Sequence, residues 1–299
     1  MLADASAATP MRHDIRHGMR HDMRHEIRLF FIALQFLTRL PAPAWVGYED
    51  AWLHQSVRHF PLAGLLVGLF GTAVLTLALS LLPAAVAVLL SMAATIWLTG
   101  ALHEDGLADT CDGLGGAVSR ERALEIMKDS RIGSYGTIGL ILALGLKAAA
   151  LTALVQFHPV LACMALLWGH AASRTAPVWL MWRLPYAGDA GHAKAKPLAV
   201  PVRAIDAIVA SAWVALLAAG LWCVAGGYEL RHDEADLTVR ALAASVLSIF
   251  LTTLMVARWL RRRLGGYTGD TLGALQQVTE IVSLLVWLAI AVALNGTHG

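Results

Sequence analysis

The feature that most constrains this chain is a long hydrophobic stretch, residues 60–102, in which no side chain carries a charge. A transmembrane helix needs about 20 consecutive apolar residues, so this stretch is long enough to cross a membrane twice. Pro83 stands midway and predicts a tight turn between two spans. The whole composition agrees, because only 15% of the 299 residues are charged, whereas a soluble domain carries about 25%. We therefore expect an integral membrane protein.

The hydrophobic segments predict an all-α fold, a polytopic membrane helix bundle of about seven transmembrane helices. One integral membrane domain, residues 28–299, is expected to contain them all. An amphipathic segment at residues 27–40 is too short to span and is expected to form an N-terminal helix at the membrane interface. The predicted spans are about 62–82, 84–102, 137–157, 160–182, 204–226, 241–260 and 274–294.

The basic residues predict the orientation, because connections on the cytoplasmic side of a membrane protein carry an excess of Lys and Arg. With a cytoplasmic N-terminus, the inner segments hold nineteen basic residues, whereas the outer connections hold only Arg231 and Arg240. We therefore expect residues 103–135 to face the cytoplasm. The inner segments are 1–60, 103–135, 183–203 and 258–263.

Residues 1–27 differ in composition from the rest of the chain. Between Met11 and Arg28 an Arg recurs every four residues, and a stripe of His runs beside it. Such a tract is typical of a metal-binding segment or of an anchor to anionic lipid. The favoured alternative is a dispensable extension that is disordered or lies on the surface.

The segment HEDGLADTCDGLGG, residues 103–116, carries three aspartates directly after the hydrophobic stretch. Asp105, Asp109 and Asp112 stand at positions i, i+4 and i+7, so at about 100° per residue they share one face of a helix. No Lys or Arg between residues 59 and 119 neutralises them. Carboxylate oxygens suit Mg²⁺ or Mn²⁺, which commonly bridge to substrate phosphates. We predict a metal site here; the alternative is a solvated acidic helix end. His103 is either a general base or a structural residue.

A basic segment, SRERALEIMKDSRIGSYG at residues 119–136, follows on the same predicted side of the membrane. Lys128 and Arg131 are candidates to hold phosphate groups opposite a metal, and Asp129 is a candidate further ligand. Ser130 and the glycines that follow it would let backbone amides approach a phosphate. The alternative is an ordinary surface helix that carries positive-inside charges.

Two basic side chains lie within predicted spans. Arg174 stands in the fourth span, where a charged residue indicates a functional site by default. Its expected partner is an anionic substrate or an Asp. Lys147 stands in the third span, and there we weigh snorkelling or structural pairing against a functional role.

The segment LGGYTGDTLGALQQVTEI, residues 264–281, combines a Gly-rich turn with the start of the last predicted span. The turn presents Thr268 and Asp270. If the chain is helical from Asp270, Gln277 and Glu280 share an arc of about 80° with it. This predicts a polar lining on one helix face; the alternative is a Gly-rich helix start with an interfacial Glu.

Together these motifs resemble the adenosylcobinamide-GDP ribazoletransferase family, whose members are also called cobalamin 5'-phosphate synthases. The resemblance covers about residues 28–294. Glu104 stands where an apolar residue is expected in relatives, so we assign it no essential role. The matching blocks are FLTRLPAP (36–43), HEDGLADTCDGLGG (103–116), EIMKDSRIGSYG (125–136) and GGYTGDTLGA (265–274), with Glu280 following.

The resemblance implies an enzyme of cobalamin nucleotide-loop assembly in the bacterial cytoplasmic (inner) membrane, with its active site facing the cytoplasm. It would join adenosylcobinamide-GDP to alpha-ribazole or its 5'-phosphate, release GMP and use Mg²⁺, with Mn²⁺ as an alternative. The expected metal ligands are Asp105, Asp109, Asp112 and Asp129. Asp270 and Glu280 are expected as further ligands or a base. The expected substrate-binding residues are Lys128, Ser130, Arg131, Arg174 and Thr268.

Three other functions stay open from the residues alone. A CDP-alcohol phosphotransferase would use similarly spaced carboxylates, but its D-G-x-x-A-R motif is absent. A secondary transporter would place Lys147, Arg174, Asp270 and Glu280 on an ion path, although we find no internal repeat. A noncatalytic subunit of an assembly complex is the third. We expect membrane lipids and no nucleic acid as partners, and leave open a homo-oligomer or other cobalamin-assembly proteins.

Overall fold

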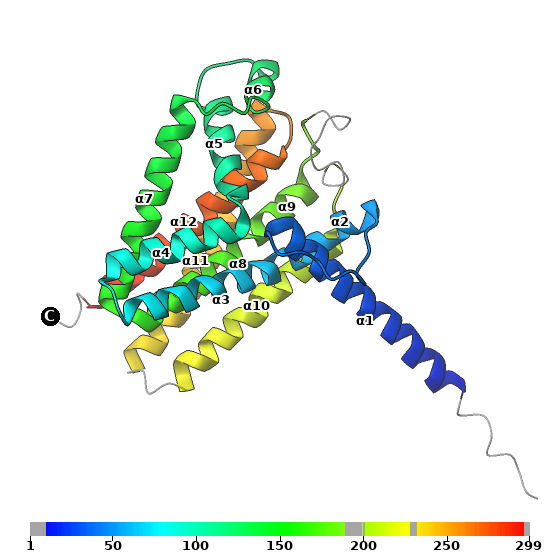
Figure 1. Ribbon diagram of the computed structural model, residues 1–299, viewed down its shortest axis with the longest axis horizontal. Helices are drawn as coiled ribbons and strands as arrows, with labels where there is room; N and C mark the ends of the chain where they lie inside the picture. The colour runs from blue at the N-terminus through cyan, green and yellow to red at the C-terminus, as the bar shows by residue number, and fades with distance from the viewer. Residues whose placement is uncertain (1–9, 189–198, 200, 228–231, 296–299) are drawn as a thin grey trace, which may run out of the picture.

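The computed structural model describes residues 10–188, 199, 201–227 and 232–295, and every regular element in these ranges is a helix (Figure 1). The prediction of an all-α helix bundle is therefore confirmed. In chain order the helices are α1 (Pro10–Leu37), α2 (Asp50–Ser56), the short 3₁₀ helix η1 (Val57–His59), α3 (Phe60–Leu79), α4 (Ala84–Thr99), α5 (Leu102–Leu114), α6 (Arg120–Ile126), α7 (Ser134–Phe157), α8 (Pro159–Ser173), α9 (Thr175–Arg183), α10 (Ala204–Gly227), α11 (His232–Arg263) and α12 (Gly269–Asn295).

Five helical segments in the described ranges are long and apolar enough to cross a membrane. A sixth is added if the bent pair α4 and α5 counts as one span. A membrane helix bundle is thus supported, whereas the count of about seven stays a prediction. The five segments are Asp50–Leu79, Ser134–Phe157, Ala204–Gly226, Asp236–Arg263 and Gly269–Leu294.

Two of the predicted spans differ from the helices that form. The predicted span 84–102 ends at Thr99, and α5 then continues at 88° to α4. The predicted span 160–182 is broken at Arg174 into α8 and α9. Pro177 explains the second break, because proline lacks the N–H that would bond to the carbonyl of Ser173 and its ring clashes with that carbonyl.

The bend between α4 and α5 rests on two consecutive residues in the left-handed region. Gly100 has φ of 67° and Ala101 has φ of 59°. The N–H of Ala101 donates to the carbonyl of Ile96 at 3.0 Å, and the N–H of Gly100 to that of Trp97 at 3.2 Å. These bonds satisfy carbonyls that the end of α4 would otherwise leave without partners. The chain therefore turns sharply at this point.

The bend directs α5 away from α4 and against α12 and α7, its main packing partners. α5, α6 and the start of α7 lie together at one end of the molecule, whereas the first half of α1 extends away from the bundle (Figure 1). The second half of α1 joins the core, where Leu29 and Ala33 are fully buried. Residues 1–9 of the predicted extension lie outside the described ranges.

Ala101 is the one non-glycine residue with positive φ in the described part of the chain. A left-handed conformation costs an L-residue about 1–2 kcal/mol, so Ala101→Gly should stabilise the fold by about 1 kcal/mol after the added chain entropy of glycine is counted. Gly100→Ala should destabilise it by a similar amount. Thermal unfolding in detergent micelles measures both variants. A lower unfolding temperature for Ala101→Gly would contradict the strain assigned to this bend.

Candidate functional site

Two groups of polar residues lie on different sides of α5 in the structure. We call the first the interior cluster; it lies among α4, α5, α7, α8 and α12. We call the second the acidic face; it comprises Asp105, Asp109 and Asp112 on α5. The interior cluster consists of Thr95, Thr99, His103, Glu104, Lys147, His170, Ser173, Arg174, Gln276, Gln277 and Glu280.

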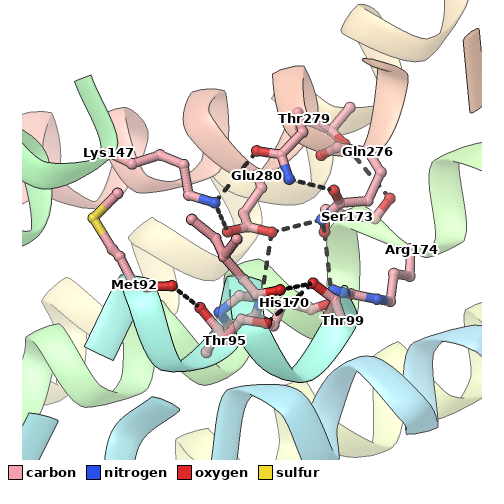
Figure 2. A network of polar contacts seen from close by, with 12 residues as sticks. Met92, Thr95, Thr99, Lys147, His170, Ser173, Arg174, Gln276, Thr279 and Glu280 are labelled. Carbon is pink, nitrogen blue, oxygen red and sulfur yellow. Dashed lines mark hydrogen bonds and ion pairs between the residues drawn. The ribbon is translucent and has the colours of Figure 1, made fainter. Parts of the chain in front are cut away.

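Glu280 is the centre of the interior cluster (Figure 2). Its Oε1 pairs with Lys147 Nζ at 2.6 Å, and its Oε2 lies 3.3 Å from His170 Nδ1. Gln276 Nε2 also donates to Oε2, at 2.5 Å. The Glu280 and Lys147 side chains are only 2% and 6% exposed. The two charges therefore offset each other within the bundle, and a functional role for Lys147 stays a hypothesis.

A second set of bonds in the interior cluster holds α5 to α12. Gln277 Nε2 donates to Glu104 Oε1 at 3.0 Å, and Lys147 Nζ donates to Gln277 Oε1 at 3.4 Å. Glu104 Oε2 is buried and has no hydrogen-bond partner in the described part of the chain. Glu104 therefore contributes to the contact between α5 and α12, and the expectation that it has no essential role stays a prediction. One indication of this position is visible in the sequence: Glu104 directly precedes Asp105, so on a helix its side chain lies about 100° away from the acidic face.

The interior cluster lies where the two helix breaks meet. Thr99 and His103 flank the bend between α4 and α5, and His170 and Arg174 flank the break between α8 and α9. Irregular backbone within a membrane is tolerated where it is buried in protein or lines a cavity. A cavity of about 10 Å³ lies between these residues, which is room for about one water molecule.

Arg174 and His103 both line this cavity and not the acidic face. Arg174 is 2% exposed, and its Nη1 donates to the carbonyl of His170 at 2.7 Å. This bond is to backbone, so the anionic partner expected for Arg174 stays a prediction. His103 is 6% exposed, and at about 200° around α5 from Asp105 it points to the opposite side. Its role as a general base is likewise untested.

The acidic face forms as the spacing predicts, because one continuous helix, α5, carries all three aspartates. Asp105 is exposed, and Asp109 and Asp112 are half-buried. Among the described residues, no three His, Cys, Asp or Glu side chains are grouped so that they could hold a metal ion. Metal binding by these aspartates stays a prediction.

Asp112 caps the start of α7. Its Oδ2 accepts the N–H of Gly133 at 2.7 Å, and its Oδ1 accepts the N–H of Gly136 at 2.8 Å. The sequence suggested that amides in this segment approach a phosphate. In the structure two of them bind the carboxylate of Asp112.

The connection between α6 and α7 carries the other predicted phosphate and metal residues. Lys128, Ser130 and Arg131 are exposed. Arg131 forms an ion pair with Asp129, with Nη2 and Oδ2 2.6 Å apart. Hydrogen bonds from the Arg131 side chain lower the pKa of Asp129 to about 2. Asp129 is therefore ionised at neutral pH, with Arg131 as its partner.

The start of α12 lies against α5. Thr268 is 5% exposed, and its hydroxyl and that of Thr271 each accept the backbone N–H of the other. This reciprocal capping begins the helix. A Cβ on Gly106 of α5 would lie 2.7 Å from the carbonyl oxygen of Asp270, so the two backbones approach closely here. Asp270 therefore lies beside the acidic face.

Glu280 is separated from Asp270 by ten residues of α12, or about 15 Å along the helix axis. Asp270 belongs to the end of the molecule that carries the acidic face, and Glu280 belongs to the interior cluster. The single polar lining expected from Asp270 to Glu280 is therefore two separate environments.

Arg120 joins the connections at this end of the bundle, a role that no sequence motif indicated. Its Nε donates to the carbonyl of Leu264 at 2.7 Å, and its Nη2 donates to that of Ala187 at 3.2 Å. The N–H of Tyr267 donates to the carbonyl of Pro185 at 3.0 Å. These bonds hold the connections before α6, after α9 and before α12 next to one another.

We predict that Glu280→Gln destabilises the protein by about 3–5 kcal/mol, because it leaves Lys147 charged and buried without its carboxylate. Replacing both residues, as Lys147→Met with Glu280→Leu, should cost less, since the lysine charge is removed together with its partner. Chemical unfolding in micelles compares the variants. A double variant less stable than Glu280→Gln would contradict this account of the ion pair.

The chain is similar to known proteins over most of its length. The sequence matches the family described as Cobalamin-5-phosphate synthase over residues 29–288. A protein of Leptothrix cholodnii named adenosylcobinamide-GDP ribazoletransferase is 56% identical over 262 residues, which are 88% of this chain and 95% of its own.

Two further relatives with the same name come from other organisms. The Shewanella amazonensis protein is 42% identical over 88% of this chain and 95% of its own. The Polaromonas naphthalenivorans protein is 42% identical over 90% of this chain and 99% of its own. No solved structure matches the chain. The match over most of its length shows that the chain belongs to the cobalamin-5-phosphate synthase family and is a transferase enzyme.

Proposed function

We propose that this protein joins adenosylcobinamide-GDP to alpha-ribazole or its 5'-phosphate, with release of GMP, in a Mg²⁺-dependent reaction. The relatives' name supports the two substrates. The observation that carries the proposal is the pairing of an acidic helix face on α5 with an exposed connection that bears Lys128 and Arg131. A metal ion held by the carboxylates would contact the anionic pyrophosphate on one side, and the basic side chains of the connection would contact it on the other.

The residues present fit a magnesium ion. Mg²⁺ is usually held by one or two carboxylates, with waters and substrate phosphates completing its coordination. Asp105 and Asp109 are one helical turn apart on one face, so they suit this role without a third protein ligand. Mn²⁺ has similar ligand preferences. A bound divalent ion would offset phosphate charge and favour the loss of GMP.

The chain's own residues would orient the two substrates. Lys128 and Arg131 would bind the phosphates from the connection above α5, and Ser130 would add a hydrogen bond. The ribose hydroxyl oxygen of the acceptor attacks the phosphorus attached to cobinamide, and the bond from that phosphorus to the GMP oxygen breaks. We assign the hydroxyl proton to Asp270, because its backbone lies against α5 beside the acidic face, whereas Glu280 lies in the interior cluster about 15 Å further along α12.

The proposed function also implies an orientation in the membrane. The excess of basic residues on one side favours a cytoplasmic position for the acidic face, where both soluble substrates would arrive. Lipid tails would surround the exposed apolar faces of the long helices, such as Ile141 and Leu142 on α7. We propose the bacterial inner membrane as the location.

The central test is GMP release by the purified protein in lipid, supplied with adenosylcobinamide-GDP and alpha-ribazole 5'-phosphate, with and without Mg²⁺. Asp109→Asn should lower turnover about 100-fold, the usual size of effect when one electrostatic group of an active site is lost. Glu121→Gln, at an exposed position on α6, is the matched control and should leave turnover unchanged. Absence of turnover in well-folded wild-type protein would refute the proposed reaction and favour a partner-dependent subunit or a transporter. Full activity of Asp109→Asn would remove only the metal assignment.

The proposed orientation predicts which engineered cysteines react with a membrane-impermeant thiol reagent. Ser130→Cys should react only in inside-out vesicles. Arg240→Cys, at an exposed position on the predicted outer side, should react only in right-side-out vesicles. A background that lacks the three native cysteines keeps the result specific. Reaction of both positions from the same side would contradict the orientation.

A further inference from the structure

We propose that Asp112 is a positioning residue, not a metal ligand: it holds the connection that carries Lys128 and Arg131 over the acidic face. This inference rests on the proposed function, because that function gives the connection its task. Spacing alone grouped Asp112 with Asp105 and Asp109 as metal ligands. The hydrogen bonds that its carboxylate accepts from two backbone N–H groups support a positioning role for Asp112.

Both carboxylate oxygens of Asp112 are already engaged by protein. Oδ2 accepts from the N–H of Gly133 at 2.7 Å, and Oδ1 accepts from that of Gly136 at 2.8 Å. These amides belong to the first turn of α7, which leaves its first N–H groups without partners inside the helix. The positive end of the helix dipole also compensates a negative charge placed there. Asp112 thus has a structural counter-charge without any metal.

Gly133 lies so close to Asp112 that no side chain fits between them. A Cβ on Gly133 would overlap the carboxylate of Asp112, and the three atoms nearest to it all belong to Asp112. The backbone of Gly133 has φ of −97°, a conformation open to any residue. The proximity of Asp112, and not the backbone conformation, therefore excludes a side chain at this position.

The other end of the connection is anchored on the same turn of α5. Met127 is buried, and a Cβ on Gly113 would lie 2.7 Å from its Cγ. Thr268 Oγ1 also contacts Met127 Sδ at 3.9 Å. Residues 128–132 lie between these two anchors and are mostly exposed. The position of Lys128 and Arg131 relative to α5 therefore depends on the contact made by Asp112.

A double-mutant cycle tests the inference with Asp112→Ala, Gly133→Ala and the two changes combined. Each single variant should lower kcat/KM for adenosylcobinamide-GDP about 100-fold, the effect that a misplacement of about 1 Å can have. In the Asp112→Ala background, Gly133→Ala should cost nothing further, because its nearest obstacle is gone. The Mg²⁺ concentration for half-maximal rate should stay unchanged in all three variants, whereas Asp109→Asn should raise it.

A second cycle tests whether the contact acts through the connection. Arg131→Ala should lower kcat/KM for adenosylcobinamide-GDP in the wild-type background and much less in the Asp112→Ala background, because the displaced arginine no longer contributes. Gly145→Ala is the matched control on α7, since nothing lies within 4 Å of a Cβ there. It should leave the rate unchanged and should not lower the unfolding temperature, because alanine suits a helix interior better than glycine.

The outcomes separate the two proposals. Turnover with a strongly raised Mg²⁺ requirement in Asp112→Ala, or additive costs in the first cycle, would overturn the positioning role and leave the proposed reaction intact. No turnover in the wild-type protein would overturn the proposed reaction, and the positioning role with it. Unfolding temperatures measured in parallel show whether a lost rate reflects displacement of the connection or loss of the whole fold.

Discussion

The interior of this bundle is organised by the need to neutralise the buried carboxylate of Glu280. An unpaired charge within a membrane protein costs several kcal/mol, so such groups are paired or hydrogen-bonded. Lys147 approaches from α7, His170 from α8 and Gln276 from α12 itself. Because the partners come from three helices, the pairing is satisfied only when these helices converge at one level. The two helix breaks occur at that level, where polar side chains can accommodate irregular backbone.

One side of helix α5 contacts the interior cluster, and its other side carries the acidic face. On the inner side, Glu104 and Gln277 tie α5 to α12. On the outer side, α5 carries the acidic face, where Asp112 accepts two backbone N–H groups from the start of α7. This inner contact between α5 and α12 suits the catalytic role proposed for the outer surface, since reacting groups must be held closely to be effective. Membership of the cobalamin-5-phosphate synthase family gives this outer surface its proposed chemistry.

Much of the fold was predictable because helical signals are local. Hydropathy identifies the apolar helices, and the spacing of Asp105 and Asp109 is enough to place them on one helix face. The two helix breaks were harder to predict from the sequence, although Pro177 indicates the break between α8 and α9. Polar partners were the least predictable: Glu104 and Gln277 are 173 residues apart in sequence, and Asp112 is 21 residues from Gly133.

By itself the sequence determined that the chain is a helical membrane protein, that α5 bears an acidic face, and which family supplies the expected reaction. Each of these depends on composition, short-range periodicity or motif identity, which can be recognised without knowledge of packing. Only the tertiary structure decided that Glu280 belongs with Lys147 and not with Asp270, and that Asp112 caps α7. Those outcomes depend on which helices meet and at what depth. Many side chains acting together set that depth, and no local pattern encodes it.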